Sequence, residues 1–285
     1  MPKTYNELYI ALRNRLKAAG VEACTLEAAL LVAAAAGKDQ AQLLADLRLY
    51  TSEEVEQRVE AMARRRLAGE PAAYITGTWG FCGLDLKVDR SVLIPRSDTE
   101  VLVETVLKLS GNRDSEYRIL DLCTGSGCIG CALAHLLPKS RVVLADVSPD
   151  ALRVAKENIQ RCALGTRALT IEADALAPAA ERLGSFDFIV CNPPYIPTAE
   201  LPTLDRSVRD FEPASALDGG EDGLKFYRAI LGGWKDLLRQ SGWLLFEVGE
   251  TQAADVEKLM RLAGLRSLGR EKDSGGWDRV VYGRL

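Results

Sequence analysis

The stretch R-I-L-D-L-C-T-G-S-G-C-I-G, residues 118–130, decides the fold of this protein. It begins with a short apolar run typical of a buried strand and continues with Gly125, Gly127 and Gly130, which match the G-x-G-x-x-G pattern. Glycines let the backbone turn without strain and approach a ligand closely. A strand, a glycine loop and the start of a helix in this order predict a nucleoside-binding turn in a parallel sheet.

The rest of the C-terminal part alternates strand-like and helix-like segments. Alternation of this kind predicts a doubly wound α/β fold, in which helices cover both faces of a mostly parallel sheet. Ligands of such sheets bind beyond the carboxyl ends of the strands. The expected strands are 118–122, 141–146, 169–174, 186–191 and 242–248, with a final antiparallel strand within 276–285, and the expected helices are 128–137, 149–161 and 224–240.

Residues 1–73 have a purely helical pattern, and we expect them to form a separate helical domain. One helix is expected to end at Gly37, a typical C-terminal cap. Another is expected to begin with a capping box formed by Thr51 and Glu54. Across residues 74–95, aromatic and β-branched residues interrupted by glycines predict a β-hairpin linker. The catalytic domain is then expected to span residues 96–285.

The composition limits the classes of protein to which the chain can belong. Of its 285 residues 47% are hydrophobic and 27% are charged, as in globular proteins. With a net charge of −4, the chain lacks the overall positive charge that is typical of a protein that binds duplex nucleic acid. No apolar run reaches the ~18 residues of a membrane span. Seven scattered cysteines favour a reducing cytoplasm over a disulfide scaffold. A single histidine, His135, argues against Ser-His-Asp catalysis and multi-histidine metal sites.

Three carboxylates stand where expected strands end. Asp121 precedes the glycine loop, where its negative charge disfavours a pyrophosphate and favours a cationic cofactor such as S-adenosylmethionine. Asp146 ends the second strand, where it can accept hydrogen bonds from ribose hydroxyls. Asp174 ends the third strand and can accept the exocyclic amine of adenine, while a backbone N–H after it meets a ring nitrogen. These positions predict a nucleoside cofactor.

The segment C-N-P-P-Y-I-P, residues 191–197, follows the fourth expected strand. Proline cannot donate to a sheet ladder, so the segment should form a stiff loop at the strand end. The Asn192 side chain offers one acceptor oxygen, and the Pro193 carbonyl offers another without a competing N–H from Pro194. Two such acceptors can hold both hydrogens of a substrate –NH2, and the Tyr195 ring can lie against a planar amide or base.

Taken together, these motifs resemble those of the peptide chain release factor glutamine methyltransferases, a family of class I S-adenosylmethionine-dependent methyltransferases. The resemblance covers essentially the whole chain, and its supporting stretches are residues 66–77, 93–104, 121–130, 192–197, 208–217 and 246–252. It implies a seven-stranded methyltransferase sheet with a small helical N-terminal domain that recognises the substrate. The implied reaction methylates the side-chain amide of the glutamine in the Gly-Gly-Gln motif of class I release factors, acts in translation termination and leaves S-adenosyl-L-homocysteine.

The family's functional residues carry over by motif. The resemblance implies that the glycine loop lines the methionine part of the cofactor, that one aspartate takes the ribose and that another flanks the adenine. It also implies that the proline-rich loop binds the substrate glutamine and is the catalytic segment, with its asparagine touching the cofactor as well. These residues are, in that order, Asp121, Cys123, Thr124, Gly125, Ser126 and Gly127; Asp146; Asp174 and Ala175; and Asn192, Pro193, Pro194 and Tyr195.

Two positions depart from the family's pattern. Cys123 stands where a glycine is common, and Ser97 stands where a proline is common. We expect an ordinary backbone conformation at Cys123 with a slightly altered loop, and a less rigid segment at Ser97.

Other functions stay open on the residues alone. An adenine-N6 methyltransferase acting on nucleic acid would use Asn-Pro-Pro-Tyr equally well but would need further nucleic-acid contacts. A ribosomal-protein glutamine methyltransferase is closer still. A dinucleotide-dependent oxidoreductase explains the glycine loop but not residues 191–197, and a non-enzymatic adaptor would not need both Asp146 and Asn192. For the favoured function we expect a cytoplasmic monomer that uses no metal, membrane or direct nucleic-acid contact.

Overall fold

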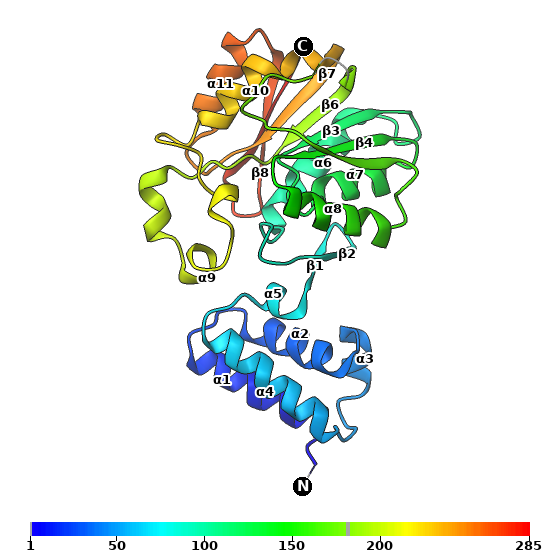
Figure 1. The fold of residues 1–285 in the computed structure, drawn as a ribbon, viewed down its shortest axis with the longest axis vertical. Helices are drawn as coiled ribbons and strands as arrows, with labels where there is room; N and C mark the ends of the chain where they lie inside the picture. Colours follow the sequence, from blue (N-terminus) through cyan, green and yellow to red (C-terminus); the bar gives the residue numbers. More distant parts are fainter. Residues whose placement is uncertain (1, 181–182) are drawn as a thin grey trace. The chain divides into compact units, whose positions relative to one another are not determined.

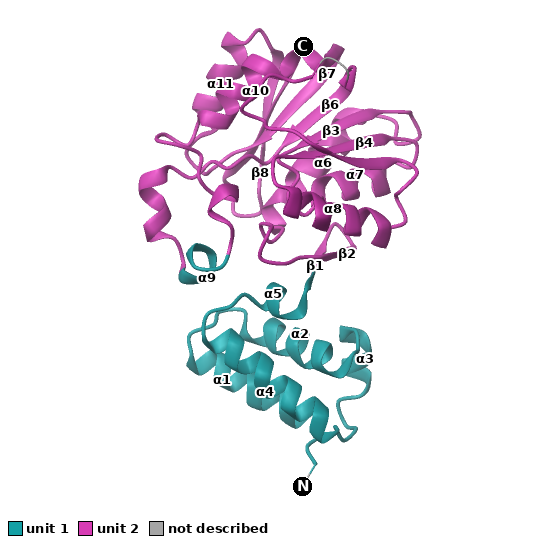
Figure 2. Ribbon diagram, viewed as in Figure 1, with its two compact units in different colours: residues 1–78, 206–211 teal, residues 79–205, 212–285 magenta. Residues whose placement is uncertain are grey.

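The computed structural model describes residues 2–180 and 183–285. The chain divides into two compact units, coloured separately in Figure 2. Unit 1 comprises residues 1–78 and 206–211, and unit 2 comprises residues 79–205 and 212–285. Within the described residues, no helix combines the length and the apolar character that crossing a membrane requires.

Unit 1 is built from amphipathic helices that bury leucines, valines and alanines against one another. Leu8, Leu12 and Leu16 recur at a spacing of four, which places them on one helix face, and this face packs on the alanine-rich second helix. That second helix ends at Gly37, whose φ of +66° gives the expected left-handed cap. The helices are α1 (Tyr5–Ala18), α2 (Cys24–Ala36), α3 (Gln40–Ala45), α4 (Glu53–Leu67), α5 (Ala72–Thr76) and α9 (Arg206–Arg209).

The expected capping box of Thr51 and Glu54 before α4 is wrong, because the N-cap is one residue further along and the N3 residue there is Val55, which has no side-chain acceptor. Ser52 is the N-cap, and its hydroxyl accepts a hydrogen bond from the Val55 N–H at 3.3 Å. The Thr51 hydroxyl instead donates to the Lys3 carbonyl at 2.9 Å. Serine and threonine are both good N-caps. The contact with Lys3, 48 positions away in the sequence, engages the Thr51 hydroxyl and leaves Ser52 as the N-cap.

Unit 2 contains a seven-stranded sheet in the order β5-β4-β3-β6-β7-β9-β8, which confirms the predicted fold class. The pairs from β5 to β7 are parallel, and β9 runs antiparallel to both of its neighbours, as expected for the final strand. A separate hairpin precedes the sheet. Its strands are β1 (Thr78–Phe81) and β2 (Leu84–Lys87); the large sheet contains β3 (Arg118–Leu122), β4 (Arg141–Asp146), β5 (Ala168–Glu172), β6 (Phe186–Cys191), β7 (Leu238–Glu247), β8 (Arg266–Lys272) and β9 (Asp278–Arg284).

Alternate residues of the central strands point into two hydrophobic cores, one on each face of the sheet. Ile119 and Phe188 belong to the core beneath α6, α7 and α8, whereas Leu120 and Ile189 belong to the core beneath α10 and α11. Figure 1 shows these two helical layers on opposite sides of the strands. The helices are α6 (Glu100–Ser110), α7 (Cys128–Leu136), α8 (Pro149–Arg161), α10 (Lys225–Gly233) and α11 (Ala253–Leu262).

The expected helix over 224–240 is too long. α10 ends at Gly233, and the chain has already entered β7 at Leu238. The expected strand at 242 therefore begins four residues earlier.

Chain order explains where ligands should bind: β3 is followed by β4 and β5 on one side and by β6 on the other, so the connections diverge at the carboxyl ends of β3 and β6.

Candidate active site

A pocket lies within unit 2 at the carboxyl ends of four neighbouring parallel strands, β5, β4, β3 and β6. Of the predicted site residues, those that line it are Cys123, Thr124, Gly125, Ser126, Asp146, Asp174, Ala175, Asn192 and Pro194. Four others lie outside the lining: Asp121, Gly127, Pro193 and Tyr195. The structure therefore brings together residues from all four predicted strand ends.

The glycine loop between β3 and α7 packs tightly on β4 and α8. A Cβ on Gly130 would lie 2.7 Å from the Leu144 Cγ, and one on Gly127 would lie 2.9 Å from the Leu144 Cδ2. Neither space accepts a side chain without a shift. Gly125 has open space around its Cα and a φ of +54°. Gly127 and Gly130 thus allow close packing, and Gly125 leaves its backbone accessible to a ligand at the pocket wall.

Asp121 is fully buried beneath this loop. Its Oδ2 accepts hydrogen bonds from the Gly130 N–H at 2.9 Å and from the Thr124 hydroxyl, while its Oδ1 has no partner among the described residues. Burial raises the pKa of Asp121 to about 7, against the opposing effect of those hydrogen bonds. Its partners lie in the loop and in the first turn of α7, so Asp121 ties the loop to the start of that helix.

Asp146 ends β4 and faces the loop. Its Oδ2 accepts a hydrogen bond from the Gly125 N–H and its Oδ1 accepts one from the Ser148 N–H, both at 2.9 Å. Burial raises the pKa of Asp146, and the backbone hydrogen bonds oppose that effect. A carboxylate oxygen can accept a second hydrogen bond, so this side chain can still receive ligand hydroxyls at the pocket wall.

Asp174 follows β5 and is exposed at the rim of the pocket, next to buried Ala175. Its Oδ1 accepts a hydrogen bond from the Leu176 N–H at 2.8 Å, which closes a local turn. This turn presents the carboxylate and the adjoining backbone to the same pocket.

Cys123 adopts a left-handed backbone conformation with a φ of +56°, so the expectation of an ordinary conformation is wrong. The loop keeps the geometry that suits glycine and imposes it on a residue with a Cβ, which costs about 1–2 kcal/mol. The thiol lines the pocket and contacts buried Cys191 of the neighbouring strand.

Replacing Cys123 with glycine is expected to raise the free energy of unfolding by about 0.5–1 kcal/mol, because strain relief exceeds the added chain entropy. Urea denaturation measures the change. Cys162→Gly is the matched control, since Cys162 caps α8 with a φ of −88° and has no such strain to relieve. Equal stability changes in the two variants would contradict the strain at Cys123.

Asn192 reaches the pocket because of the register between β3 and β6. Leu122 is paired with Cys191, so the next residues along the two strands, Cys123 and Asn192, emerge side by side. Asn192 is half-buried, and its Nδ2 donates a hydrogen bond to the Thr99 Oγ1 at 3.3 Å. Its Oδ1 is thereby left available at the pocket.

Tyr195 is not among the residues that line the pocket. Its hydroxyl lies 3.5 Å from the Glu247 Oε1, and burial raises its pKa. The carbonyl of Tyr195 accepts a hydrogen bond from the Gln252 Nε2 at 2.9 Å, and Gly219 and Gly223 pack directly against its backbone. The conformation of the proline-rich loop is therefore set by segments 217–223 and 249–252 behind it.

Two other segments that line the pocket received no site role from the sequence. They contribute Ser91, Val92, Leu93, Pro95, Arg96 and Thr99 from the chain before α6, and Pro213, Ser215 and Ala216 from the chain before α10. Both segments overlap stretches that the family resemblance had already included, so the sequence did mark them as family-specific. Only the long-range contacts of the structure show that their residues line the pocket.

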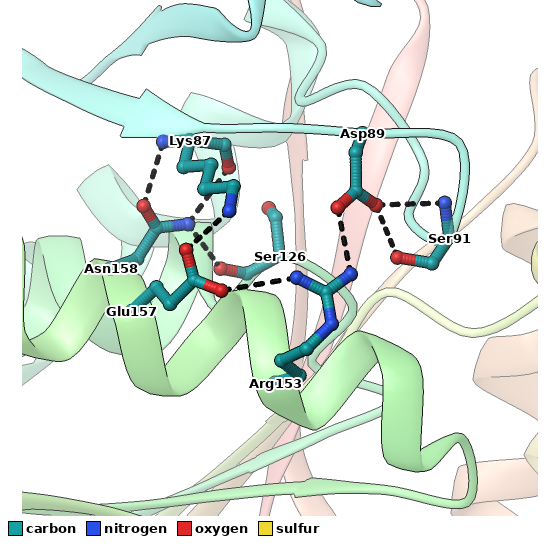
Figure 3. A network of polar contacts seen from close by, with 7 residues as sticks. All are labelled: Lys87, Asp89, Ser91, Ser126, Arg153, Glu157 and Asn158. Carbon is teal, nitrogen blue, oxygen red and sulfur yellow. Dashed lines mark hydrogen bonds and ion pairs between the residues drawn. The ribbon is translucent and has the colours of Figure 1, made fainter.

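Figure 3 shows how the first of these segments is anchored to α8 and the glycine loop. Fully buried Asn158 accepts the Lys87 N–H at 2.7 Å and donates its Nδ2 to the carbonyls of Lys87 and Ser126, at 2.9 and 2.8 Å. Arg153 pairs with Asp89 at 2.8 Å. One amide thus joins the last residue of β2 to the loop after β3, and the chain leads from there to residues 91–96 at the pocket.

The second segment is tied to the first by Glu212. Its side chain is 1% exposed, pairs with the Arg96 guanidinium and accepts the Ile94 N–H at 3.2 Å. Because Arg96 is neutralised in this way, the unpaired charges of the pocket lining are the carboxylates of Asp146 and Asp174.

This lining fits S-adenosylmethionine. Its carboxylates suit a cationic nucleoside and would repel a pyrophosphate. Ser126 is one of the lining residues, and its buried hydroxyl has no hydrogen-bond partner within the described part of the chain, so an unsatisfied polar group is present beside the pocket. In residues 2–180 and 183–285 no cluster of three or more His, Cys, Asp or Glu side chains could hold a metal ion.

A seven-stranded sheet with this pocket defines a class I S-adenosylmethionine-dependent methyltransferase. The chain is 41% identical to the release factor glutamine methyltransferase of Geobacter sulfurreducens, covering 96% of this chain and 94% of that one. It is 46% identical to the enzyme of the same name from Moorella thermoacetica, covering 88% and 87%. The chain belongs to the release factor glutamine methyltransferase family.

Family-level and structural matches agree. Residues 7–77 match the PrmC N-terminal domain, and residues 97–205 match the methyltransferase small domain. The hMettl16 catalytic domain, solved in complex with the MAT2A 3'UTR hairpin 6, aligns with a TM-score of 0.58 and 16% identity over 81% of this chain and 82% of that one. At that identity the likeness shows the shared fold alone.

Proposed function

We propose that this protein transfers the methyl group of S-adenosyl-L-methionine to the side-chain amide nitrogen of the glutamine in the Gly-Gly-Gln motif of class I peptide chain release factors. The observation that carries the proposal is the position of Asn192. Its amide stands at the pocket wall beside Cys123, at the meeting point of β3 and β6, in a chain whose relatives are named for this activity. The catalytic segment is then residues 192–195.

The cofactor supplies a sulfonium-activated methyl group. Asp146 would hold the ribose hydroxyls, Asp174 and Ala175 would hold the adenine, and the loop at residues 123–126 would face the methionine part. Asp121 and Gly127 support that loop from outside the lining. These assignments are supported by the positions of the groups, which either line the pocket or contact the loop that lines it.

The chain's contribution to the reaction is orientation. A primary amide nitrogen is a poor nucleophile because its lone pair is delocalised into the carbonyl. The Asn192 Oδ1 and the Pro193 carbonyl would accept the two hydrogens of the substrate –NH2 and so fix the direction of the nitrogen lone pair. Both acceptors interact more strongly as positive charge grows on that nitrogen, which favours the transition state over the ground state. No side-chain base is required, since the methylated amide loses its extra proton readily.

We further propose that the helical domain, residues 1–73, recognises the release factor, with residues 74–95 as a hairpin linker to the catalytic domain at 96–285. The enzyme would act as a cytoplasmic monomer without direct nucleic-acid contact. The net charge of −4 supports the last point.

The decisive experiment incubates a purified class I release factor with the enzyme and methyl-labelled S-adenosyl-L-methionine, followed by peptide mass spectrometry. One methyl group on the Gly-Gly-Gln glutamine supports the proposal. Label on a ribosomal protein or on adenine in nucleic acid, with the release factor unlabelled, would establish a rival function. A thermal shift with NAD but not with S-adenosyl-L-methionine would refute the cofactor as well.

Replacing Asp146 with alanine is expected to weaken binding of S-adenosyl-L-methionine by about tenfold or more, because a hydrogen bond to a charged group contributes about 1.5–3 kcal/mol. Calorimetric titration measures the dissociation constant. Asp150→Ala is the control, since Asp150 is an exposed aspartate in the first turn of α8. If the Asp146 variant binds like the control, the ribose assignment is wrong.

A further inference from the structure

The Asn158 side chain on α8 bonds three backbone groups from two separate segments. Its Oδ1 accepts the Lys87 N–H at 2.7 Å, and its Nδ2 donates to the Lys87 carbonyl at 2.9 Å and to the Ser126 carbonyl at 2.8 Å (Figure 3). A backbone N–H can only donate and a carbonyl can only accept, so these partners fix the orientation of the amide. The side chain is fully buried, where an unmade hydrogen bond is costly.

One of these bonds holds the centre of the glycine loop. The Ser126 carbonyl and the Gly127 N–H belong to the same peptide unit. The carbonyl accepts from Asn158, and the N–H donates to the Thr124 carbonyl at 2.8 Å. Ala155, three residues before Asn158 on α8, packs closely on the same unit, since a Cβ on Gly127 would lie 3.1 Å from the Ala155 Cβ. The conformation of the loop at the pocket therefore depends on α8.

The other two bonds hold Lys87, the last residue of β2. Two residues further along, the Asp89 carboxylate accepts from the Arg153 guanidinium at 2.8 Å and from the Ser91 N–H at 3.0 Å. Ser91 begins the part of this segment that lines the pocket. The side chains of Arg153 and Asp89 are 46% and 35% exposed, and an ion pair contributes little at such a position. Of these two attachments to α8, the buried one at Asn158 should contribute more.

We propose that Asn158 is a positioning residue that couples the binding of S-adenosyl-L-methionine at the glycine loop to the ordering of residues 87–91. One rigid amide joins the two segments, so a ligand that holds the loop also holds the amide against Lys87. Such a coupling is reciprocal: the cofactor favours the attached segment by the same factor by which the attachment favours the cofactor. The inference rests on the proposed function in one respect, the assignment of the cofactor to the glycine loop.

Asn158→Ala removes all three hydrogen bonds. We expect the Kd for S-adenosyl-L-methionine to rise about tenfold, a usual size for the coupling between two sites. At saturating cofactor kcat should stay within about threefold, because Asn158 is not among the residues that line the pocket. Asn158→Leu restores the bulk of the side chain without its donors and acceptor, and the Kd should remain raised. Calorimetric titration and turnover at saturating cofactor measure the two quantities, and a Kd near that of the wild type in either folded variant overturns the proposal.

Met260→Ala separates this coupling from a general loss of stability. Met260 is fully buried in α11, belongs to the core on the opposite face of the sheet from α8 and does not line the pocket. Its truncation leaves a cavity and should lower the melting temperature, as Asn158→Ala does, but the Kd for S-adenosyl-L-methionine should stay within about twofold. An equal rise of the Kd in both variants would assign the effect to stability and overturn the proposal.

Amide hydrogen exchange tests the coupling in the wild type, without any substitution. Saturating S-adenosyl-L-methionine should slow exchange of the Lys87 N–H by about the same factor by which Asn158→Ala raises the Kd. The Asn6 N–H, which donates to the Leu47 carbonyl at 2.9 Å within the helical unit, is the control and should exchange at the same rate with and without the cofactor. An unchanged rate at Lys87 overturns the proposal.

The two proposals fail in different ways. A wild-type enzyme that binds S-adenosyl-L-methionine but leaves the release factor unmethylated refutes the proposed function. The Kd values and the exchange rate of the Lys87 N–H need no release factor, so they still decide the role of Asn158.

Discussion

Asn192→Ala is expected to lower kcat for methylation of the release factor by about a hundred- to a thousandfold, the usual effect of removing one preorganised hydrogen-bonding group from a reacting centre. The side chain supplies the acceptor that orients the substrate nitrogen, and the remaining acceptor, the Pro193 carbonyl, cannot fix two hydrogens alone. Affinity for S-adenosyl-L-methionine should stay near that of the wild type, because most of the proposed cofactor contacts come from the other strand ends. Single-turnover kinetics with labelled cofactor, together with calorimetry, measure both quantities.

Asn112→Ala is the control for this variant, since Asn112 is exposed in the turn after α6. A kcat within a few-fold of the wild type in Asn192→Ala would remove the amide clamp from the mechanism. A parallel loss of cofactor affinity would show that Asn192 serves the cofactor rather than the substrate.

Gly223→Ala is expected to lower the free energy of unfolding by about 3 kcal/mol and to reduce turnover at the same time. The new Cβ would lie 2.3 Å from the Tyr195 carbonyl oxygen and 2.4 Å from the Gln252 Nε2, the two atoms of the hydrogen bond that fixes the proline-rich loop. The φ of +71° adds strain. Either the hydrogen bond breaks or the backbone of residue 195 moves, and both displace Asn192.

The control for this prediction is Gly220→Ala. Gly220 also has a positive φ, of +87°, but the three atoms nearest its added Cβ all belong to the Lys225 side chain, the closest at 3.1 Å. Urea denaturation of the two variants separates backbone strain from the clash with the loop. Equal losses of stability, with turnover preserved in Gly223→Ala, would show that the Gln252 contact does not position the catalytic segment.

Local patterns in the sequence were sufficient for the core of the fold. β3, β4, β6 and α8 have the predicted bounds because each is a continuous apolar or amphipathic run between clear start and stop residues. β8 escaped prediction for the opposite reason. Its residues, from Arg266 to Lys272, are mostly polar and lie at the edge of the sheet, so they become a strand through pairing with β9 and not through hydrophobic alternation.

The sequence by itself determined which strand ends carry chemistry, because carboxyl ends of neighbouring parallel strands must meet at one edge of a sheet. Asp146, Asp174 and Asn192 could be selected on that ground, and the structure places all three at one pocket. Only the tertiary structure decided which distant side chains contact the residues of the proline-rich loop. The partnership of Asn192 with Thr99 spans 93 residues, and that of Tyr195 with Glu247 spans 52. Contacts of this length depend on the register of β3 with β6 and on the packing of α6 and β7 around it, and these are set by the whole core rather than by any local run of residues.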